Sequence, residues 1–194
     1  MMRRGGITLV TVIAVAALVG CTGGEDGWER APLCINTDDS VFVLIAQSVP
    51  SATELPCVSE FPAGWTFGGT DISSGLSRFW LNSDRGGIHA VEVSLQDSCD
   101  TAGAVEERPA PDEVGTRVFV RPDSLTPSFT GVRFLLFVGG CIAYTFRFAS
   151  GASSTLAIET IEALSLLPRA AIVAEVRKDP GLTLCGAGAP ACAG

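Results

Sequence analysis

The chain has 194 residues with 21 acidic and 13 basic side chains, a formal net charge of −8. This acidic balance argues against nucleic-acid binding, which needs clustered positive charge. The length is sufficient for one domain with its own hydrophobic core plus a short leader. We therefore expect no nucleic-acid partner and no cofactor needed for stability.

Residues 1–20 have the pattern of a secretory signal. Arg3 and Arg4 precede an apolar stretch from Ile7 to Val19, too short for a permanent membrane span of about 20 residues. It ends in Leu18-Val19-Gly20-Cys21, which resembles the lipobox of bacterial lipoproteins. The resemblance implies cleavage before Cys21 and a diacylglyceryl (palmitate-type) group on its thiol. The alternatives are a plain signal peptide with a chance cysteine and an uncleaved anchor.

The resemblance predicts a protein anchored by lipid on the extracytoplasmic face of the cell membrane. Two acyl chains give stable anchoring, and cleavage, which removes Arg3 and Arg4, lowers the net charge from −8 to −10. Membrane contact is therefore expected through the lipid on Cys21 alone. Residues 21–33 are predicted to be a lipidated flexible tether. Its Trp28 lies at the membrane interface, is an exposed linker residue, or folds back on the domain. Residues 34–194 form the single extracytoplasmic domain.

The first part of the domain is ambiguous. Residues 38–47 are either a short helix, which Thr37, Asp38 and Asp39 would cap, or a strand built on a β-branched run; we favour the helix. Pro50, Pro56 and Pro62 then predict an irregular passage.

Strand signals dominate the middle of the chain. A turn at Ser83–Gly87 and a Gly139-Gly140 link predict two hairpins. Residues 100–115 and 122–131 are predicted to be loops. The expected strands are Trp65–Phe67 onward, Arg78–Asn82, Ile88–Leu95, Thr116–Arg121, Val132–Val138 and Cys141–Phe148.

The hydrophobic period changes near the C-terminus. A helix is predicted from Ser153 or Ser154 to about Leu167, and a second over residues 170–178, with a turn at 179–181. Strands first and helices last predict an α+β domain, with an antiparallel sheet of about five to six strands and C-terminal helices on one face. An all-β sandwich is the alternative.

Once Cys21 carries lipid, six cysteines remain in an oxidising compartment, and disulfides are the expected outcome. Sequence alone leaves fifteen pairings open. We favour Cys34–Cys57 and Cys99–Cys141, which leaves Cys185 and Cys192. A metal site is not expected, because the chain has no CxxC pair and a single histidine.

No catalytic motif is present. The chain lacks GxSxG, and SxxK is excluded because Lys178 is the only lysine. His89 falls on the apolar phase of its strand with Val91, Val93 and Leu95, which indicates a packed or edge histidine. The acids Asp84, Asp97, Asp100, Glu106 and Glu107 lie in predicted turns and loops, where solvation is the default. A paired-acid glycosidase site stays open.

Five arginines on predicted strands suggest a binding face. By alternation they lie opposite several apolar side chains, and Trp80 and Phe119 share their phase. Such a face would bind a carboxylate, a phosphate or an anionic wall polymer, unless the arginines simply pair with Asp and Glu on a solvated face, which we favour. The arginines are Arg78, Arg117, Arg121, Arg133 and Arg147.

Residues 34–192, through the GCIAYTF hairpin and the cysteine placement, resemble uncharacterised small lipoproteins of high-GC (actinobacterial) bacteria. That resemblance implies no activity and no functional residue. The sequence therefore predicts a membrane-anchored binding or structural module of the cell envelope, with an envelope polymer or a protein as partner. The alternative is an envelope hydrolase with a carboxylate site, which would gather several of the named acids, or His89, in one cleft.

Overall fold

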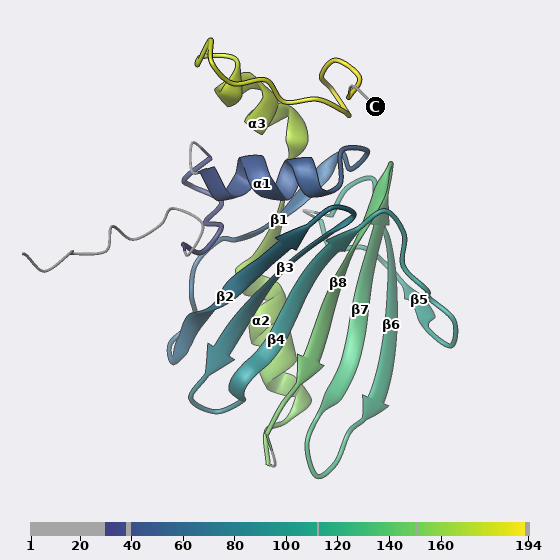
Figure 1. The fold of residues 1–194 in the computed structure, drawn as a ribbon. Coiled ribbons are helices and arrows are strands. Elements are labelled where there is room, and N and C mark those ends of the chain that lie inside the picture. The colour runs from purple at the N-terminus through teal and green to yellow at the C-terminus, as the bar shows by residue number, and fades with distance from the viewer. Residues whose placement is uncertain (1–29, 38–39, 112, 150, 193–194) are drawn as a thin grey trace, which may run out of the picture.

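The fold is an α+β arrangement with two antiparallel sheets, as Figure 1 shows for a computed structural model. The structure describes residues 30–37, 40–111, 113–149 and 151–192. The signal, Cys21 and the tether up to residue 29, like the proposed cap at Asp38 and Asp39, lie outside them. Helices and strands together confirm the α+β class over the all-β alternative.

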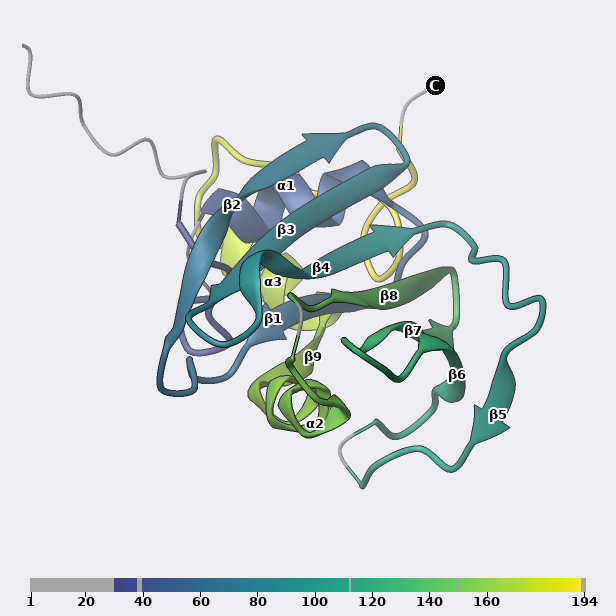
Figure 2. The ribbon, with the colours of Figure 1, turned by 90° about the horizontal axis from the view of Figure 1, so that it is seen from below.

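A seven-stranded antiparallel sheet is the main element, larger than the five to six strands expected. One face is covered by the helices and by a small second sheet, and the dominant hydrophobic core lies between these layers (Figure 2). In order across the sheet, its strands are β2 (Trp65–Ser73), β3 (Leu76–Ser83), β4 (Gly87–Gln96), β8 (Gly140–Arg147), β7 (Thr130–Phe137), β6 (Arg117–Ser124) and β5 (Val105–Glu107).

The ambiguous segment after Thr37 is a helix, α1 (Ser40–Ser48). Its β-branched and aromatic residues Val41, Phe42 and Ile45 are buried against the core. Tertiary burial here outweighs the modest helix propensity of such residues.

The proline-rich passage contains a strand that the sequence analysis missed. β1 (Glu54–Val58) passes through Pro56 and pairs antiparallel with β9 (Leu164–Pro168). β9 is the second miss, because the helix expected to reach Leu167 ends at Ala163: α2 spans Ser154–Ala163. Proline is tolerated in β1 because a two-stranded sheet leaves one side of each strand unpaired.

The later helix agrees with the prediction. α3 (Arg169–Val176) follows Pro168 directly and buries Ile172, Val173 and Val176, in keeping with the tolerance of helix starts for proline. The predicted loops are shorter than expected, because β5 lies within residues 100–115 and β6 and β7 extend into residues 122–131.

The predicted β7–β8 hairpin is present, with its turn one residue earlier than expected. Phe137 pairs with Gly140, so Val138 and Gly139 form the turn. Gly139 has φ +77°, and a Cβ there would lie 1.9 Å from the carbonyl oxygen of Ser51. Only glycine therefore allows this turn to pack against the chain leading into β1.

Three disulfides staple the fold, with the pairing favoured from sequence. Cys34–Cys57 ties the chain before α1 to β1, and Cys99–Cys141 ties the loop after β4 to β8. Cys185–Cys192 closes a short C-terminal loop. Each closure stabilises mainly by restricting the unfolded chain.

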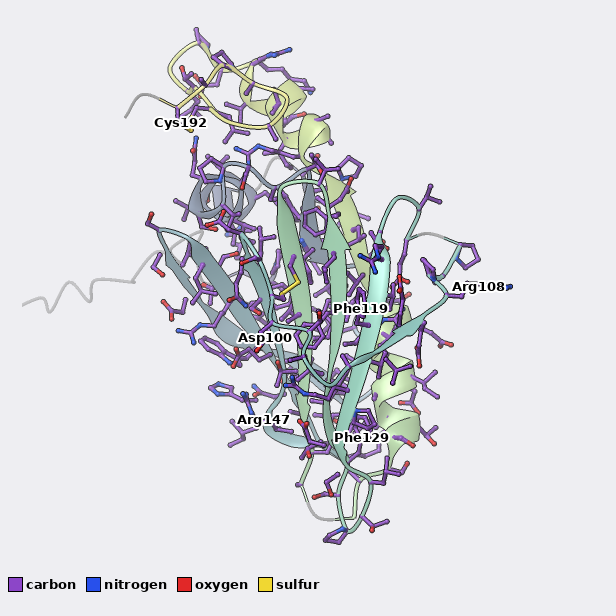
Figure 3. The ribbon with its side chains drawn as sticks, turned by 90° about the vertical axis from the view of Figure 1, so that its right-hand side faces the viewer. Asp100, Arg108, Phe119, Phe129, Arg147 and Cys192 are labelled. Carbon is purple, nitrogen blue, oxygen red and sulfur yellow. A yellow bond between two sulfur atoms is a disulfide. The ribbon has the colours of Figure 1, made fainter. Side chains whose placement is uncertain are left out.

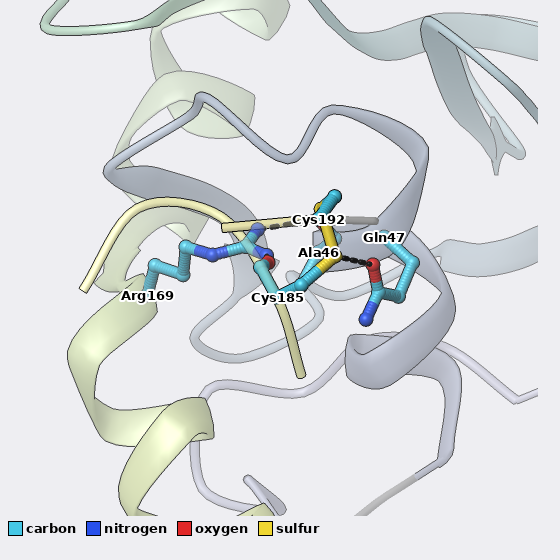
Figure 4. Close-up of a disulfide and its surroundings, with 5 residues drawn as sticks. All are labelled: Ala46, Gln47, Arg169, Cys185 and Cys192. Atoms are coloured by element: carbon cyan, nitrogen blue, oxygen red, sulfur yellow. Dashed lines mark hydrogen bonds between the residues drawn. A yellow bond between two sulfur atoms is a disulfide. The ribbon is translucent and has the colours of Figure 1, made fainter. Parts of the chain in front are cut away.

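The C-terminal loop is held by a buried arginine, as Figure 4 shows. The Arg169 guanidinium donates to the carbonyl oxygens of Ala46, near the end of α1, and of Cys185. A cation at a helix C-terminus is favoured by the helix dipole. Desolvation lowers the pKa of Arg169 from its ordinary value, and the side chain joins α1, α3 and the disulfide loop.

Among the described residues, none of the helices has the length and apolar character that crossing a membrane requires. The apolar run from Val132 to Phe148 forms the β7–β8 hairpin.

Candidate functional site

Within the described residues, the second face of the seven-stranded sheet carries no helix, and we call it the outer face (Figure 1). Strand register assigns side chains to it, because residues paired across antiparallel strands point to the same side. Trp80 pairs with Glu92, which pairs with Thr145, which pairs with Val132. Val132 pairs in turn with Arg121 on β6, so these residues form one row across the outer face.

The outer face has its own small apolar cluster. Val132, Phe134, Cys141 and Ala143 are buried there, with Phe119 and Leu136 packed against them. Residues 97–104, anchored by the Cys99–Cys141 disulfide, cover part of this cluster through Cys99 and Ala104. Figure 3 views the molecule from the β5 side, with Asp100, Phe119 and Arg147 labelled.

A hollow of about 550 Å³ lies beside this cluster, and we call it the outer-face hollow. Its base includes the apolar residues Val132, Phe134 and Ala143. The rest of the lining consists of Phe146, four uncharged polar residues, two arginines and three carboxylates: Phe146, Ser94, Gln96, Thr130, Thr145, Arg121, Arg147, Glu92, Asp100 and Asp123.

Glu92 is the central acid of the hollow. Its Oε2 accepts from Arg147 Nη1 and from Trp80 Nε1, both at 3.2 Å. Trp80 stacks on His89 with ring centroids 5.1 Å apart, and the Arg78 guanidinium lies 5.7 Å from the Trp80 ring centroid. These contacts fix Glu92 as an ion-pair partner on β4.

Arg121 lines another part of the hollow. Its Nε donates to Asp123 at 3.3 Å, and its Nη1 donates to the carbonyl of Ala102 at 3.2 Å. The guanidinium also lies over the Phe134 ring, 5.6 Å from its centroid. Asp100 accepts from the backbone N–H of Ala102 at 2.9 Å. The backbone of Ala102, in the loop after β4, therefore contacts both Arg121 and Asp100.

Four of the five predicted arginines do share the outer face, and each forms an ion pair, the alternative that the sequence analysis favoured. The partners of Arg78, Arg117, Arg121 and Arg147 are Asp71, Glu106, Asp123 and Glu92, respectively.

The electrostatic effect is clearest for Arg117. Its hydrogen bonds to Glu106 lower the pKa of that carboxyl from its ordinary value and raise the pKa of the guanidinium. Both groups are thereby held in their charged forms.

Arg133 is the exception, and its placement on the arginine face was wrong. It pairs with Tyr144 and Val120 in the register of the inner face. Its guanidinium is almost buried and donates to both oxygens of Glu113, at 2.9 and 2.8 Å. Alternation failed here because β7 is apolar on both faces, so no polar phase marks the solvent side.

His89 is also misplaced by the alternation rule. Between the pairs Leu81–Val91 and Ser83–Gly87, β4 has two more residues than β3, a bulge that shifts the phase. His89 lies in it with φ +49°, is exposed, and donates its backbone N–H to Asn82 Oδ1 at 2.8 Å. It therefore does not join Val91, Val93 and Leu95.

The acids of the hollow are mostly not those singled out from the sequence. Only Asp100 was named, whereas Asp84, Asp97, Glu106 and Glu107 do not line it. Glu92 and Asp123 were missed, although their positions could have indicated them. Glu92 lies at an outward position of β4, and Asp123 lies near the end of β6. Within the described residues no group of three or more potential ligands is arranged to hold a metal ion.

Comparison with known proteins gives no family assignment: no family model, no curated protein and no solved structure matches this chain.

Proposed function

We propose that the chain is a lipoprotein, anchored through Cys21 on the extracytoplasmic face of the membrane, whose domain binds an envelope component at the outer-face hollow. The anchoring rests on the signal pattern of residues 1–20. From Cys21 to Arg30 the chain can span at most about 30 Å, which keeps the domain close to the membrane surface.

Anchoring is tested by mass spectrometry of the N-terminal peptide from membrane-extracted protein. The expected mature chain starts at Cys21 and carries a diacylglyceryl group, and Cys21→Ser is expected to abolish that group. A chain that starts elsewhere, or a Cys21 without lipid, contradicts the proposal.

The observation that carries the binding function is the outer-face hollow itself. It combines an apolar base with charged groups of both signs on the outer face of the sheet. Ligand sites are typically apolar pockets with a few placed polar groups, and 550 Å³ is within their usual range.

The charges favour one kind of envelope component. Arg121 and Arg147 face three carboxylates, Glu92, Asp100 and Asp123, so a polyanion would meet as much repulsion as attraction. A ligand with both ammonium and carboxylate groups suits this lining better. Among envelope polymers, the peptide-bearing wall polymer, peptidoglycan, has that chemistry.

Binding is tested by co-sedimentation with isolated peptidoglycan. The variant Arg121→Glu/Arg147→Glu is expected to lose binding, whereas Arg85→Glu is expected to retain it. Arg85 is a matched control because it is also exposed and paired with a glutamate, Glu159, but lies in the β3–β4 turn outside the hollow. Equal binding by the unchanged protein and by both variants contradicts the proposal. Preferential binding to a polyphosphate probe contradicts the argument from the charges of the lining.

The envelope hydrolase is a second candidate, and the observation that favours it is the gathering of three carboxylates around one hollow. Against it, Glu92 is engaged by Arg147 and Trp80, and Asp123 by Arg121. Release of soluble sugar from peptidoglycan that is abolished by Glu92→Gln would establish the hydrolase.

A further inference from the structure

A second, more apolar depression lies away from the sheet, between α1 and the end of α3. This α1–α3 groove has a volume of about 760 Å³, and Val43, Leu44, Val176, Pro180 and Leu182 supply its apolar lining. Leu44 and Leu182 remain 44% and 50% exposed. Large side chains of this kind around one groove indicate a surface that a partner covers.

The composition of α1 supports this interpretation. One side of the helix packs into the core through Val41, Phe42 and Ile45, yet the other side carries Val43 and Leu44. A helix that is apolar on all sides is normally buried on all sides. In the described chain, the side of α1 that faces the groove is the part left uncovered.

The chain itself supplies an occupant. Thr37 lines the groove, and the chain before it leads back to Arg30, the first described residue, which lies within the tether. The tether segment Thr22–Glu29 reads TGGEDGWE, with Trp28 as its single large apolar side chain. Because the segment is covalently attached, its effective concentration at the domain is of millimolar order, so a weak apolar contact is sufficient for docking.

We infer that Trp28 docks in the α1–α3 groove and fastens the tether to the domain. The contact is apolar rather than ionic, because Glu175 and Asp179 outnumber Lys178 in the lining, and Glu25, Asp26 and Glu29 make the segment acidic. Docking leaves six residues between Cys21 and Trp28, a reach of at most about 25 Å. The end of the domain that carries α1 and α3 is then held toward the attachment point.

The test measures acrylamide quenching of Trp28 in the chain with Cys21→Ser, so the outcome does not depend on lipidation or on the binding function. Subtracting the signal of a further Trp28→Ser variant removes the contributions of Trp65 and Trp80. We expect Trp28 to be protected, and its quenching constant to rise severalfold in Leu44→Glu and in Leu182→Glu. Higher salt should increase the protection by screening the like charges.

Ile158→Glu is the matched control, since Ile158 is an exposed apolar side chain on α2, outside the groove. It is expected to leave quenching unchanged. A Trp28 as accessible as in the free peptide TGGEDGWE, or protection that survives both groove substitutions, overturns the inference. Protection that grows with protein concentration, or that appears only when phosphatidylcholine vesicles are added, also overturns it, in favour of a second copy or the bilayer.

Discussion

The two faces of the seven-stranded sheet use the same ion-pair chemistry in different surroundings. On the inner face the side chains of Arg133 and Glu113 are 10% and 8% exposed. On the outer face those of Arg147 and Glu92 are 59% and 18% exposed. A buried pair must stay intact because either charge alone would be stranded. An exposed pair is screened by water, so losing it costs little stability.

The largest effect is expected on the inner face. Glu113→Ala leaves the Arg133 guanidinium largely buried without its main partner, since Glu107 lies 3.6 Å away and is half exposed. Breaking such a pair costs about 3–5 kcal/mol. Urea unfolding followed by circular dichroism measures the loss. A loss below about 1 kcal/mol would show that this buried pair contributes no more stability than an exposed ion pair does.

A double variant sharpens this result. Arg133→Met with Glu113→Leu removes both charges together, and similar replacements of buried pairs are often neutral or stabilising. We therefore expect the double variant to be more stable than Glu113→Ala. If both are equally unstable, lost packing rather than a stranded charge is the cause.

The next effect concerns the outer face. The Cys99–Cys141 disulfide spans 42 residues, and its removal by Cys99→Ser/Cys141→Ser is expected to cost about 2–4 kcal/mol. Because this bridge holds residues 97–104 over the outer apolar cluster, peptidoglycan binding should fall as well. Thermal unfolding and co-sedimentation report the two effects. Unchanged binding by a folded variant would show that residues 97–104 do not contribute to binding at the outer-face hollow.

Removing an exposed pair should have a smaller effect. Arg147→Ala is expected to cost less than about 1 kcal/mol, as exposed ion pairs usually do, while weakening peptidoglycan binding. The same urea titration measures the stability. A loss comparable to that of Glu113→Ala would contradict the distinction between the two faces.

The smallest effect is a pH dependence. The hydrogen bonds from Arg117 lower the folded-state pKa of Glu106, so their stabilising contribution is present above the unfolded pKa of about 4.3 and is lost as pH falls through the folded value. An NMR titration of the Glu106 carboxyl should show the lowered pKa, and Arg117→Met should return it toward the ordinary value. No response to Arg117→Met would exclude this cause.

Local signals in the sequence predicted much of the fold. The β7–β8 hairpin follows from two β-rich runs around a glycine pair, and α3 follows from the spacing of Ile172, Val173 and Val176. The hairpin and the helix depend on neighbouring residues, which a sequence displays directly. The disulfide pairs were favoured for the segments that they would connect, but the sequence itself allows fifteen pairings.

The missed features depend on distant contacts. Pro56 becomes a strand residue only because it pairs with Leu166, and that pairing also converts the expected end of a helix into β9. The outer-face hollow needs the order of strands β4, β8, β7 and β6, which fixes whether Glu92, Arg121 and Arg147 meet. The alternation of side chains along each strand could not show that Arg133 points to the inner face and Arg121 to the outer face.

The most direct test of the outer face as a binding surface is an NMR titration of the domain with soluble peptidoglycan fragments. Binding there predicts amide shifts concentrated at the outward positions of β4, β8, β7 and β6 and in residues 97–104. Shifts concentrated on α1, α2 and α3, or no shifts at any fragment concentration, would contradict it.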